Sequence, residues 1–344
     1  MHMKKSLIAA LAMALALPAA AQTLINGAGA TFPYPLYSKW FAEYNKLQPD
    51  LRFNYQSIGS GGGIQQITNG TVDFGATDAP MNAEETARLP GALHIPTVLG
   101  AVVAIHNTPV EGLKLTPALL ADIFLGKVVR WDDPAIAKVN AGLKLPATAI
   151  TVAHRSDGSG TTYIFTDYLA KVSPAWKEKV GAGKSVKWPV GLGGKGNEGV
   201  TGLVKQTPGA IGYVELAYAN QNKLSMAALQ NRDGVFVSPS LEATSAAAAG
   251  VPMPADFKVS LTDPSGKTAW PIASFTYLLV KKDQTDPRKG EALVRFLWWA
   301  VHDGQKLAAP LDYAPLPPAV VAQVEKAIRT ITVQGKPVGL AAAR

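Results

Sequence analysis

Short apolar segments that look like strands alternate with helix-like segments along most of the chain, and this alternation constrains the fold more than any other sequence feature. The strand-like segments are 51–56, 72–76, 97–105, 149–153, 210–215 and 275–280. The segments with helical spacing of apolar residues are 35–47, 117–125, 161–171, 290–307 and 318–331. Strands and helices that alternate in this way predict an α/β fold.

The length of the chain predicts two lobes, because 344 residues exceed one ordinary hydrophobic core. Two strand-like runs, near 98–106 and 272–281, are candidates for crossovers between the lobes. The first would carry the chain out and the second would bring it back. We therefore expect residues 22–105 and 272–344 to form a discontinuous lobe I, and residues 106–271 to form lobe II.

The N-terminus has the pattern of a secretory signal peptide over residues 1–21. Lys4 and Lys5 precede an apolar run at 7–17, and an Ala19-Ala20-Ala21 end follows. The alternative is an N-terminal anchor helix, but the apolar run is shorter than the ~18–20 residues that span a bilayer. Removing the segment lowers the formal net charge of +8 by two. We expect an exported, soluble, mildly basic protein whose diffuse charge does not indicate nucleic-acid binding.

The composition excludes several kinds of functional site. The chain has no cysteine, which excludes disulfides, iron–sulfur clusters, cysteine zinc sites, thiol catalysis and a cysteine-linked lipid anchor. The histidines are scattered and form no H-E-x-x-H pair. A histidine metal site or a Ser–His–Asp triad therefore has no local support, and we expect neither a metal nor a cofactor.

Three glycine-rich turns carry the chemistry, and each enters a predicted helix. They are 27–32 (GAGATF), 59–63 (GSGGG) and 154–161 (HRSDGSGT). Glycine lets the backbone approach a ligand closely, and a helix N-terminus offers unpaired N–H donors with partial positive charge. One such turn is most simply a helix cap. Three in one chain, one of them with an arginine, predict a site that surrounds a small tetrahedral anion with donors.

Other glycine patterns are weaker. The sequences around Lys184 and Lys267 lack the first glycine of a P-loop. Residues 194–199 match the G-x-G-x-x-G dinucleotide fingerprint, follow a strand-like segment at 186–190, and have Glu215 about twenty residues further on. The alternative is a glycine-rich loop that starts a helix, and the mid-chain position in an exported protein favours that alternative.

Two carboxylates stand near these turns. Asp78 follows a predicted strand end, where an aspartate commonly forms an Asx-turn or a helix cap. Asp157 lies two residues after Arg155, so it is placed to orient the guanidinium and offset its charge. The alternative for Asp157 is a solvated turn residue.

These segments together resemble a known family. Residues 27–32, 55–63, 73–80, 154–161, 188–199 and 208–215, with 131–133 and 311–314, resemble in order the periplasmic phosphate-binding proteins of phosphate-specific ABC importers. The resemblance implies a type II periplasmic-binding-protein fold of two α/β lobes joined by two hinge crossovers, with the ligand in the cleft. It also implies one dehydrated inorganic phosphate as ligand, a membrane permease as partner, a soluble periplasmic monomer, and no nucleophile, metal or cofactor.

The resemblance also implies a role for individual residues. Backbone N–H groups and hydroxyls would donate to the anion, Asp78 would accept a hydrogen bond from protonated phosphate, and Arg155 would supply charge while Asp157 holds it. The implied ligand-binding residues are Thr31, Phe32, Ser60, Asp78, Arg155, Ser159, Gly160 and Thr161. Gly61 departs from the family, which often has a second serine there, and we expect a small effect with a lost donor as the alternative.

Two other functions remain as alternatives. A phosphatase or phosphoryl-transfer enzyme would need a nucleophile with a nearby base, and neither Ser60 nor Ser159 has a base close in sequence. A binder of sulfate or molybdate would use the same donors. Asp78 discriminates against that class, because a fully deprotonated oxyanion offers it no proton.

Overall fold

The protein is described by a computed structural model that covers residues 22–340, so the predicted signal peptide at 1–21 lies outside the described residues. The strands are β1 Thr23–Gly29, β2 Leu51–Ser57, β3 Phe74–Thr77, β4 Ala92–His106, β5 Lys114–Leu115, β6 Thr151–Arg155, β7 Leu192–Gly194, β8 Ala210–Glu215, β9 Ser225–Met226, β10 Ala228–Gln230, β11 Phe236–Val237, β12 Leu261–Thr262, β13 Ile272–Lys281, β14 Asp283–Gln284, β15 Thr332–Val333 and β16 Lys336–Pro337.

Helices separate most of these strands, which confirms the predicted α/β fold. They are α1 Tyr34–Leu47, α2 Ser60–Thr68, α3 Ala83–Arg88, α4 Pro117–Phe124, α5 Pro134–Val139, α6 Gly160–Val172, α7 Pro174–Lys179, α8 Gly196–Gln206, α9 Leu216–Gln221, α10 Leu241–Ala248, α11 Pro287–Ala300 and α12 Pro318–Arg329, with short 3₁₀ turns at Asp303–Leu307 and Ala309–Leu311.

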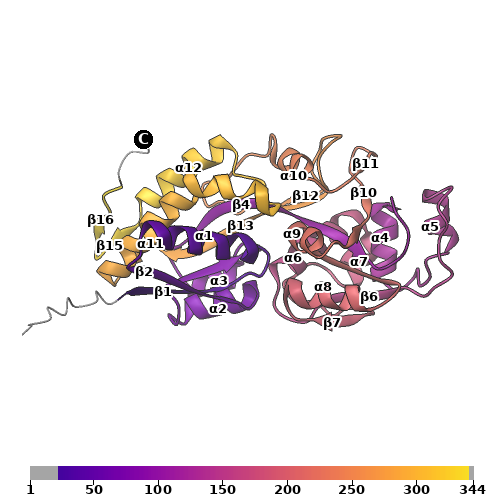
Figure 1. Cartoon of the computed structure of the whole chain (residues 1–344), viewed down its shortest axis with the longest axis horizontal. Helices are drawn as coiled ribbons and strands as arrows, with labels where there is room; N and C mark the ends of the chain where they lie inside the picture. Colours follow the sequence, from indigo (N-terminus) through magenta and orange to yellow (C-terminus); the bar gives the residue numbers. More distant parts are fainter. Residues whose placement is uncertain (1–21, 341–344) are drawn as a thin grey trace, which may run out of the picture.

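The main sheet has the strand order β2-β1-β3-β13-β4-β8-β6-β7, and the long strand β4 lies in the middle of it. Residues 92–101 of β4 pair with β13, and residues 102–106 pair with β8. Figure 1 shows the result: β1, β2, β3 and their helices form one body, β6, β7, β8 and theirs form another, and β4 runs between them. This pairing fits two lobes, and the lobe limits at 105/106 and 271/272 stay a prediction.

Helices cover both faces of each half of the sheet. In the first half, α1 and α11 lie on one side of β1 and β2, and α2 lies on the other (Figure 1). Phe41 of α1, Phe53 of β2 and Phe296 of α11 pack together, with ring centroids 4.5–5.4 Å apart. In the second half, Phe165 of α6 stacks on Tyr213 of β8 at 4.3 Å. These aromatic contacts pack the helices of each half onto its strands.

Two sequence predictions of element limits are wrong. The helix predicted over 290–307 ends at Ala300, where the chain turns so that Gly304 packs on Trp299 and accepts a hydrogen bond from Trp40 (2.8 Å). The strand-like segment at 186–190 is not a strand. The backbone of this segment does not join the sheet, and the ring of Trp188 stacks on His154 with the ring centroids 4.8 Å apart.

Candidate functional site

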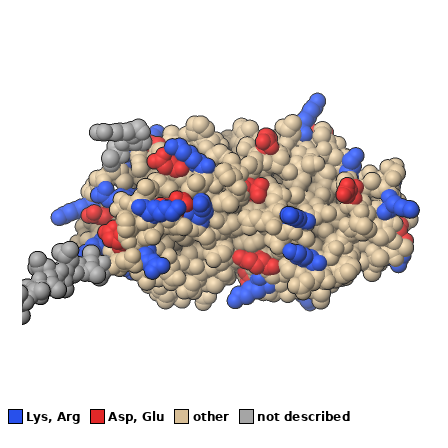
Figure 2. Space-filling view, viewed as in Figure 1, with Lys and Arg blue, Asp and Glu red and all other residues tan. Residues whose placement is uncertain are grey.

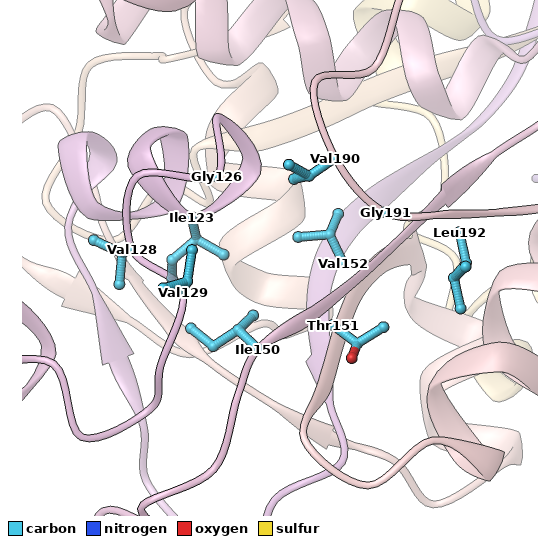
Figure 3. Close-up of a pocket in the computed structure, with 10 residues that line it drawn as sticks. All are labelled: Ile123, Gly126, Val128, Val129, Ile150, Thr151, Val152, Val190, Gly191 and Leu192. Atoms are coloured by element: carbon cyan, nitrogen blue, oxygen red, sulfur yellow. The ribbon is translucent and has the colours of Figure 1, made fainter.

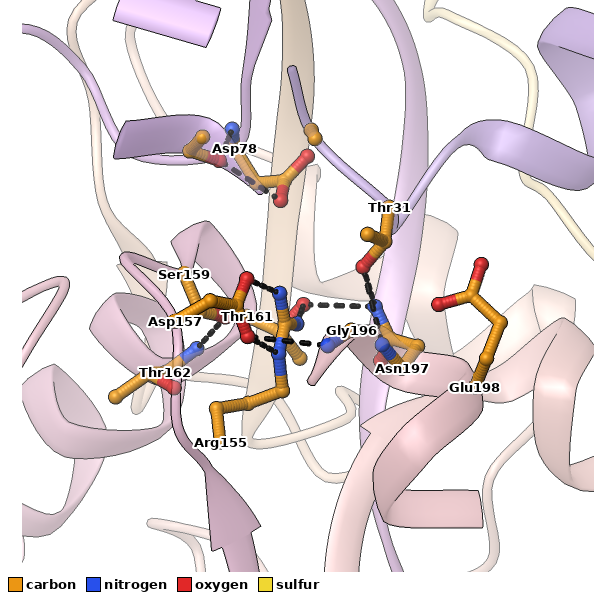
Figure 4. A network of polar contacts seen from close by, with 12 residues as sticks. Thr31, Asp78, Arg155, Asp157, Ser159, Thr161, Thr162, Gly196, Asn197 and Glu198 are labelled. Atoms are coloured by element: carbon orange, nitrogen blue, oxygen red, sulfur yellow. Dashed lines mark hydrogen bonds and ion pairs between the residues drawn. The ribbon is translucent and has the colours of Figure 1, made fainter. Parts of the chain in front are cut away.

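The three glycine-rich turns come together between the two halves of the sheet. Each follows the carboxyl end of a strand and leads into a helix: β1 into α1, β2 into α2, and β6 into α6. Carboxyl ends of strands in α/β sheets are where ligands bind. Figure 4 shows Thr31 and Asp78 from the first half facing Arg155 and Thr161 from the second.

Thr31, Phe32 and Ser60 line the first half of this site, and all three are buried. The turn before Ser60 needs glycine. Gly59 has a φ of +87°, and a Cβ there would lie 2.3 Å from a carboxylate oxygen of Asp157. Glycine thus allows the first helix turn of α2 to approach the second half of the molecule.

Asp78 sits in the same wall and is 1% exposed. Thr276 Oγ1 donates to its Oδ1 (2.8 Å), and Ser60 Oγ lies 3.3 Å from its Oδ2. Burial raises the pKa of Asp78 to about 7, although the Thr276 hydrogen bond, the Arg155 charge and the Ser60 hydrogen bond act in the opposite direction. The Asp78 carboxyl caps no helix, because its hydrogen bonds go to the side chains of Thr276 and Ser60.

The raised pKa of Asp78 makes stability depend on pH. Because its pKa exceeds the unfolded value of 3.8, the folded chain holds a proton that the unfolded chain has lost between pH 4 and 7. Without ligand, the free energy of unfolding is expected to fall by on the order of 2–4 kcal/mol as pH rises through this window. Above the window it should stay level. Urea unfolding at pH 5 and pH 8 measures the change. Asp78→Asn should remove this pH dependence of stability. An equal pH dependence in the variant and the wild type would refute the role of Asp78.

Arg155 and Asp157 form a buried pair on the second half. Arg155 is 3% exposed, and its Nε and Nη2 both bond to the Asp157 carboxylate, the first at 2.7 Å. Burial alone would raise the pKa of Asp157, but the Arg155 hydrogen bonds and charge outweigh it and hold the pKa below its usual value. Gly196 N–H also donates to Asp157 (3.0 Å). The remaining Nη1 of Arg155 lies 3.3 Å from Thr161 Oγ1, so one edge of the guanidinium faces the site.

Ser159, Gly160 and Thr161 form the start of α6. The Ser159 hydroxyl accepts the N–H of Thr162 (3.0 Å), which is a helix N-cap. The cap and ligand-binding interpretations of this turn are compatible, because the hydroxyl still has a proton to donate. Gly160 has no room for a side chain, since a Cβ would lie 2.4 Å from Ser60 Oγ and 2.5 Å from Asp78 Oδ2.

Five backbone N–H groups around this site find no acceptor among residues 22–340. Buried N–H groups are almost always paired, so a cluster of unpaired ones indicates a site for an acceptor ligand. They belong to Thr31, Phe32, Ser60, Gly160 and Thr161. All five residues were predicted from the sequence as ligand-binding, and Figure 4 shows Asp78 and Arg155 near Thr31 and Thr161.

Further contacts join the two halves around the site. Gly61 N–H donates to Gly158 O (2.9 Å), and Lys184 Nζ pairs with Glu85 at 2.8 Å. A Cβ on Gly61 would lie 3.2 Å from Gly158 Cα, so this position faces backbone of the other half. The expected small effect of glycine at this position stays a prediction.

Sequence reasoning missed the residues that hold the predicted ones in place. Thr276 of β13 fixes Asp78, Tyr218 donates to Thr31 O (2.6 Å), and Tyr313 donates to Phe32 O (2.6 Å). Asn197 bonds to the hydroxyls of both Thr31 and Thr161. Asn197 lies inside the 194–199 glycine pattern, which runs from the end of β7 into the first turn of α8. The sequence signal that could have found Asn197 is this fourth glycine-rich segment leading into a helix, in addition to the three turns described above.

A separate hollow lies beside Thr151 and Val152, at the amino end of β6, and its lining is mostly aliphatic. Its volume is about 290 Å³, and Figure 3 shows aliphatic side chains such as Val129, Val190 and Leu192 around it. None of its lining residues is charged. It therefore offers no charged side chain to an anion, whereas the polar site holds Arg155 and Asp78.

Comparisons with known proteins identify the family of the chain. The PBP superfamily domain family matches residues 16–303. The chain is 49% identical over 335 residues to the phosphate-binding protein PstS of Pasteurella multocida, with 96% of each chain covered. It is 49% identical over 316 residues to PstS of Xylella fastidiosa (strain 9a5c), with 90% of this chain and 86% of that one covered.

A solved structure resembles the fold. It is that of a high-affinity periplasmic phosphate-binding protein (PfluDING) bound with phosphate, with a TM-score of 0.71 at 22% identity, covering 88% of this chain and 93% of that one. At this identity the likeness concerns the fold alone.

Proposed function

The chain belongs to the phosphate-binding proteins of the PBP superfamily and has their two-lobed type II fold, and from this membership we propose that it binds inorganic phosphate in the periplasm and delivers it to the permease of an ABC importer. The ligand lies dehydrated between the lobes. The proposal covers lobe I at 22–105 and 272–344, and lobe II at 106–271. It also covers a soluble monomer exported by its signal peptide.

The observation that carries the proposal is the set of five unpaired N–H groups beside Arg155 and Asp78. A dehydrated phosphate needs donors for nearly all its lone pairs and one acceptor for its proton. The donors come from Thr31, Phe32, Ser60, Gly160 and Thr161, with Arg155 and the hydroxyls, including that of Ser159. Asp78 is the acceptor. Titration calorimetry with phosphate, on protein unfolded and refolded to remove carried-over ligand, tests the proposal, and a failure to bind phosphate would contradict it.

The proposal includes no enzymatic activity. The structure does place a carboxylate of Asp78 3.3 Å from Ser60 Oγ, which is the geometry that a phosphatase would need. Ser60 Oγ, however, also accepts the Asp78 N–H (3.1 Å), and the relatives at 49% identity are named as binding proteins. We expect no release of p-nitrophenol from its phosphate ester. Steady release that is lost in Ser60→Ala would support the enzyme instead.

The charge distribution agrees with a small anion rather than a nucleic acid as ligand. Figure 2 shows basic and acidic side chains interspersed over the face in view. A nucleic-acid site would gather its basic residues in one patch. Between residues 22 and 340, no helix is both long and apolar enough to cross a membrane.

Closure of the lobes is expected to follow phosphate binding. The donors come from both lobes, so phosphate binds the closed form more tightly than the open one. Small-angle X-ray scattering should show a smaller radius of gyration with phosphate than with sulfate or no anion. Arg155→Ala is the control, because it should not close at the same phosphate concentration. An unchanged radius in the wild type would contradict ligand-driven closure.

A further inference from the structure

Asn197 lies at the centre of the site without belonging to the predicted set. It is the second residue of α8, is fully buried, and lies between Thr31 of lobe I and Thr161 of lobe II (Figure 4). It does not cap its own helix, since the N-cap of α8 is Lys195 and shows no side-chain cap bond. Its side chain therefore serves something other than the helix start.

The orientation of the Asn197 amide is fixed by the backbone. Its Oδ1 accepts the N–H of Glu215 (3.0 Å), and only an oxygen can accept that bond. The Nδ2 group must then face the other way, where it donates to Thr31 Oγ1 (2.7 Å) and Thr161 Oγ1 (3.1 Å). Glu215 ends β8 and pairs with Val102 of β4, so a strand ladder anchors this orientation.

Each of the two hydroxyls accepts two N–H bonds. Thr31 Oγ1 also accepts the backbone N–H of Asn197 (3.1 Å), and Thr161 Oγ1 also accepts Arg155 Nη1 (3.3 Å). A hydroxyl has two lone pairs and one proton, so both oxygens have only the proton left to offer. Neither hydroxyl donates a hydrogen bond to any residue in the described range 22–340.

We propose that Asn197 is a positioning residue that commits the hydroxyls of Thr31 and Thr161 to donate to the bound anion. This inference rests on the proposed function, because the protons are directed toward phosphate. A free hydroxyl rotates and would spend part of its time as an acceptor, which repels an anion. The neutral amide removes that state for one hydroxyl of each lobe, and it adds no charge to the site.

The first test removes the side chain. Asn197→Ala is expected to weaken phosphate binding on the order of 30-fold in calorimetry, since two hydrogen bonds to a charged group lose their fixed direction. The matched control is Asn140→Ala. Asn140 is also buried, with its Oδ1 accepting Lys114 N–H and its Nδ2 donating to Lys114 O and Ile136 O, away from the site. The control should lower stability and leave the Kd within about twofold.

The second test asks whether Asn197 acts through the threonines. In a Thr31→Val, Thr161→Val background, adding Asn197→Ala should change the Kd less than about threefold, because the hydroxyls are already gone. A loss as large as in the wild type would overturn the inference. Asn197→Asp keeps the shape and the Glu215 bond if the alanine variant does not fold. Its second oxygen accepts the threonine protons, so wild-type affinity in this variant would also overturn the inference.

The same titrations separate this inference from the proposed function. A wild-type protein that binds no phosphate would overturn the proposed function, and the inference with it. A wild type that binds phosphate, with Asn197→Ala at the same Kd, would overturn the inference alone.

Discussion

Arg155→Ala is expected to weaken phosphate binding by on the order of 3–5 kcal/mol, more than two orders of magnitude in Kd. Arg155 is the only cation that we assign to the site, and it lies buried against Asp157 with Nη1 toward Thr161. The substitution removes charge-assisted bonds to the anion. It also leaves the Asp157 carboxylate uncompensated beside it. Titration calorimetry gives the change in Kd directly.

The double variant Arg155→Ala, Asp157→Ala should recover part of the loss, because the leftover negative charge is also gone. A double variant that binds no better than the single one would refute the role of Asp157. The chain contains a matched control at Arg130 and Asp132. That pair has the same spacing and two side-chain bonds of 2.9 and 3.0 Å, but it is exposed. Neither Arg130→Ala nor its double with Asp132→Ala should change the Kd.

Asp78→Asn is expected to relax the rejection of sulfate. Phosphate at neutral pH carries a P–OH that the Asp78 carboxylate can accept, whereas sulfate presents only lone pairs and like charge. Sites built around one such hydrogen bond reject an analogue that lacks it by about 10⁴–10⁵. The wild type should therefore ignore sulfate. The variant should keep measurable phosphate binding and gain sulfate binding.

The surroundings of Asp78 predict which way the new amide turns. Thr276 Oγ1 donates to Oδ1, so the amide oxygen takes that position. The NH₂ group then takes the place of Oδ2, next to Ser60 and the start of α6. Competition calorimetry with phosphate and sulfate measures the selectivity. If the variant still ignores millimolar sulfate, selectivity comes from cavity size or from the number of fixed donors.

Asp73→Asn is the control for this experiment. Asp73 also lies in the first half of the sheet, where it accepts the N–H of Asn26 (2.7 Å) and pairs with Lys289, outside the site. Its substitution alters a carboxylate of the same lobe and should leave both anion affinities unchanged.

Local sequence patterns predicted the donors but not the groups that orient them. The strand at 210–215 and the helix starts at Ser60 and Gly160 follow from periodicity and from glycine. Thr276 and Tyr313 reach the site from distant parts of the chain, and only the family resemblance of 311–314 marks the segment of Tyr313. Their contacts arise only when β13 pairs between β3 and β4, and when Ala314 bridges Leu99 of β4.

The role of Asn197 also could not be predicted from its local sequence. The glycine pattern at 194–199 runs from the end of β7 through Lys195 into the first turn of α8, so it starts a helix. The role of the Asn197 side chain follows only from contacts made in the folded protein. Glu215 N–H fixes the orientation of the amide, and Thr31 from the other half of the sheet accepts its Nδ2–H. Such coupling across lobes has no signature within one segment.

The position of β13 has a consequence for how the chain folds during synthesis. β13, at Ile272–Lys281, lies between β3 and β4 in the sheet, although β3 ends at Thr77 and β4 at His106, far earlier in the chain. The N-terminal strands cannot complete their sheet until this late segment has emerged from the ribosome. Closing so large a loop is slow, and early chains keep unpaired strand edges. The strands that are synthesised first therefore reach their native sheet order only after Ile272–Lys281 has been made, whereas β6, β7 and β8 can pair with one another and with β4 before that.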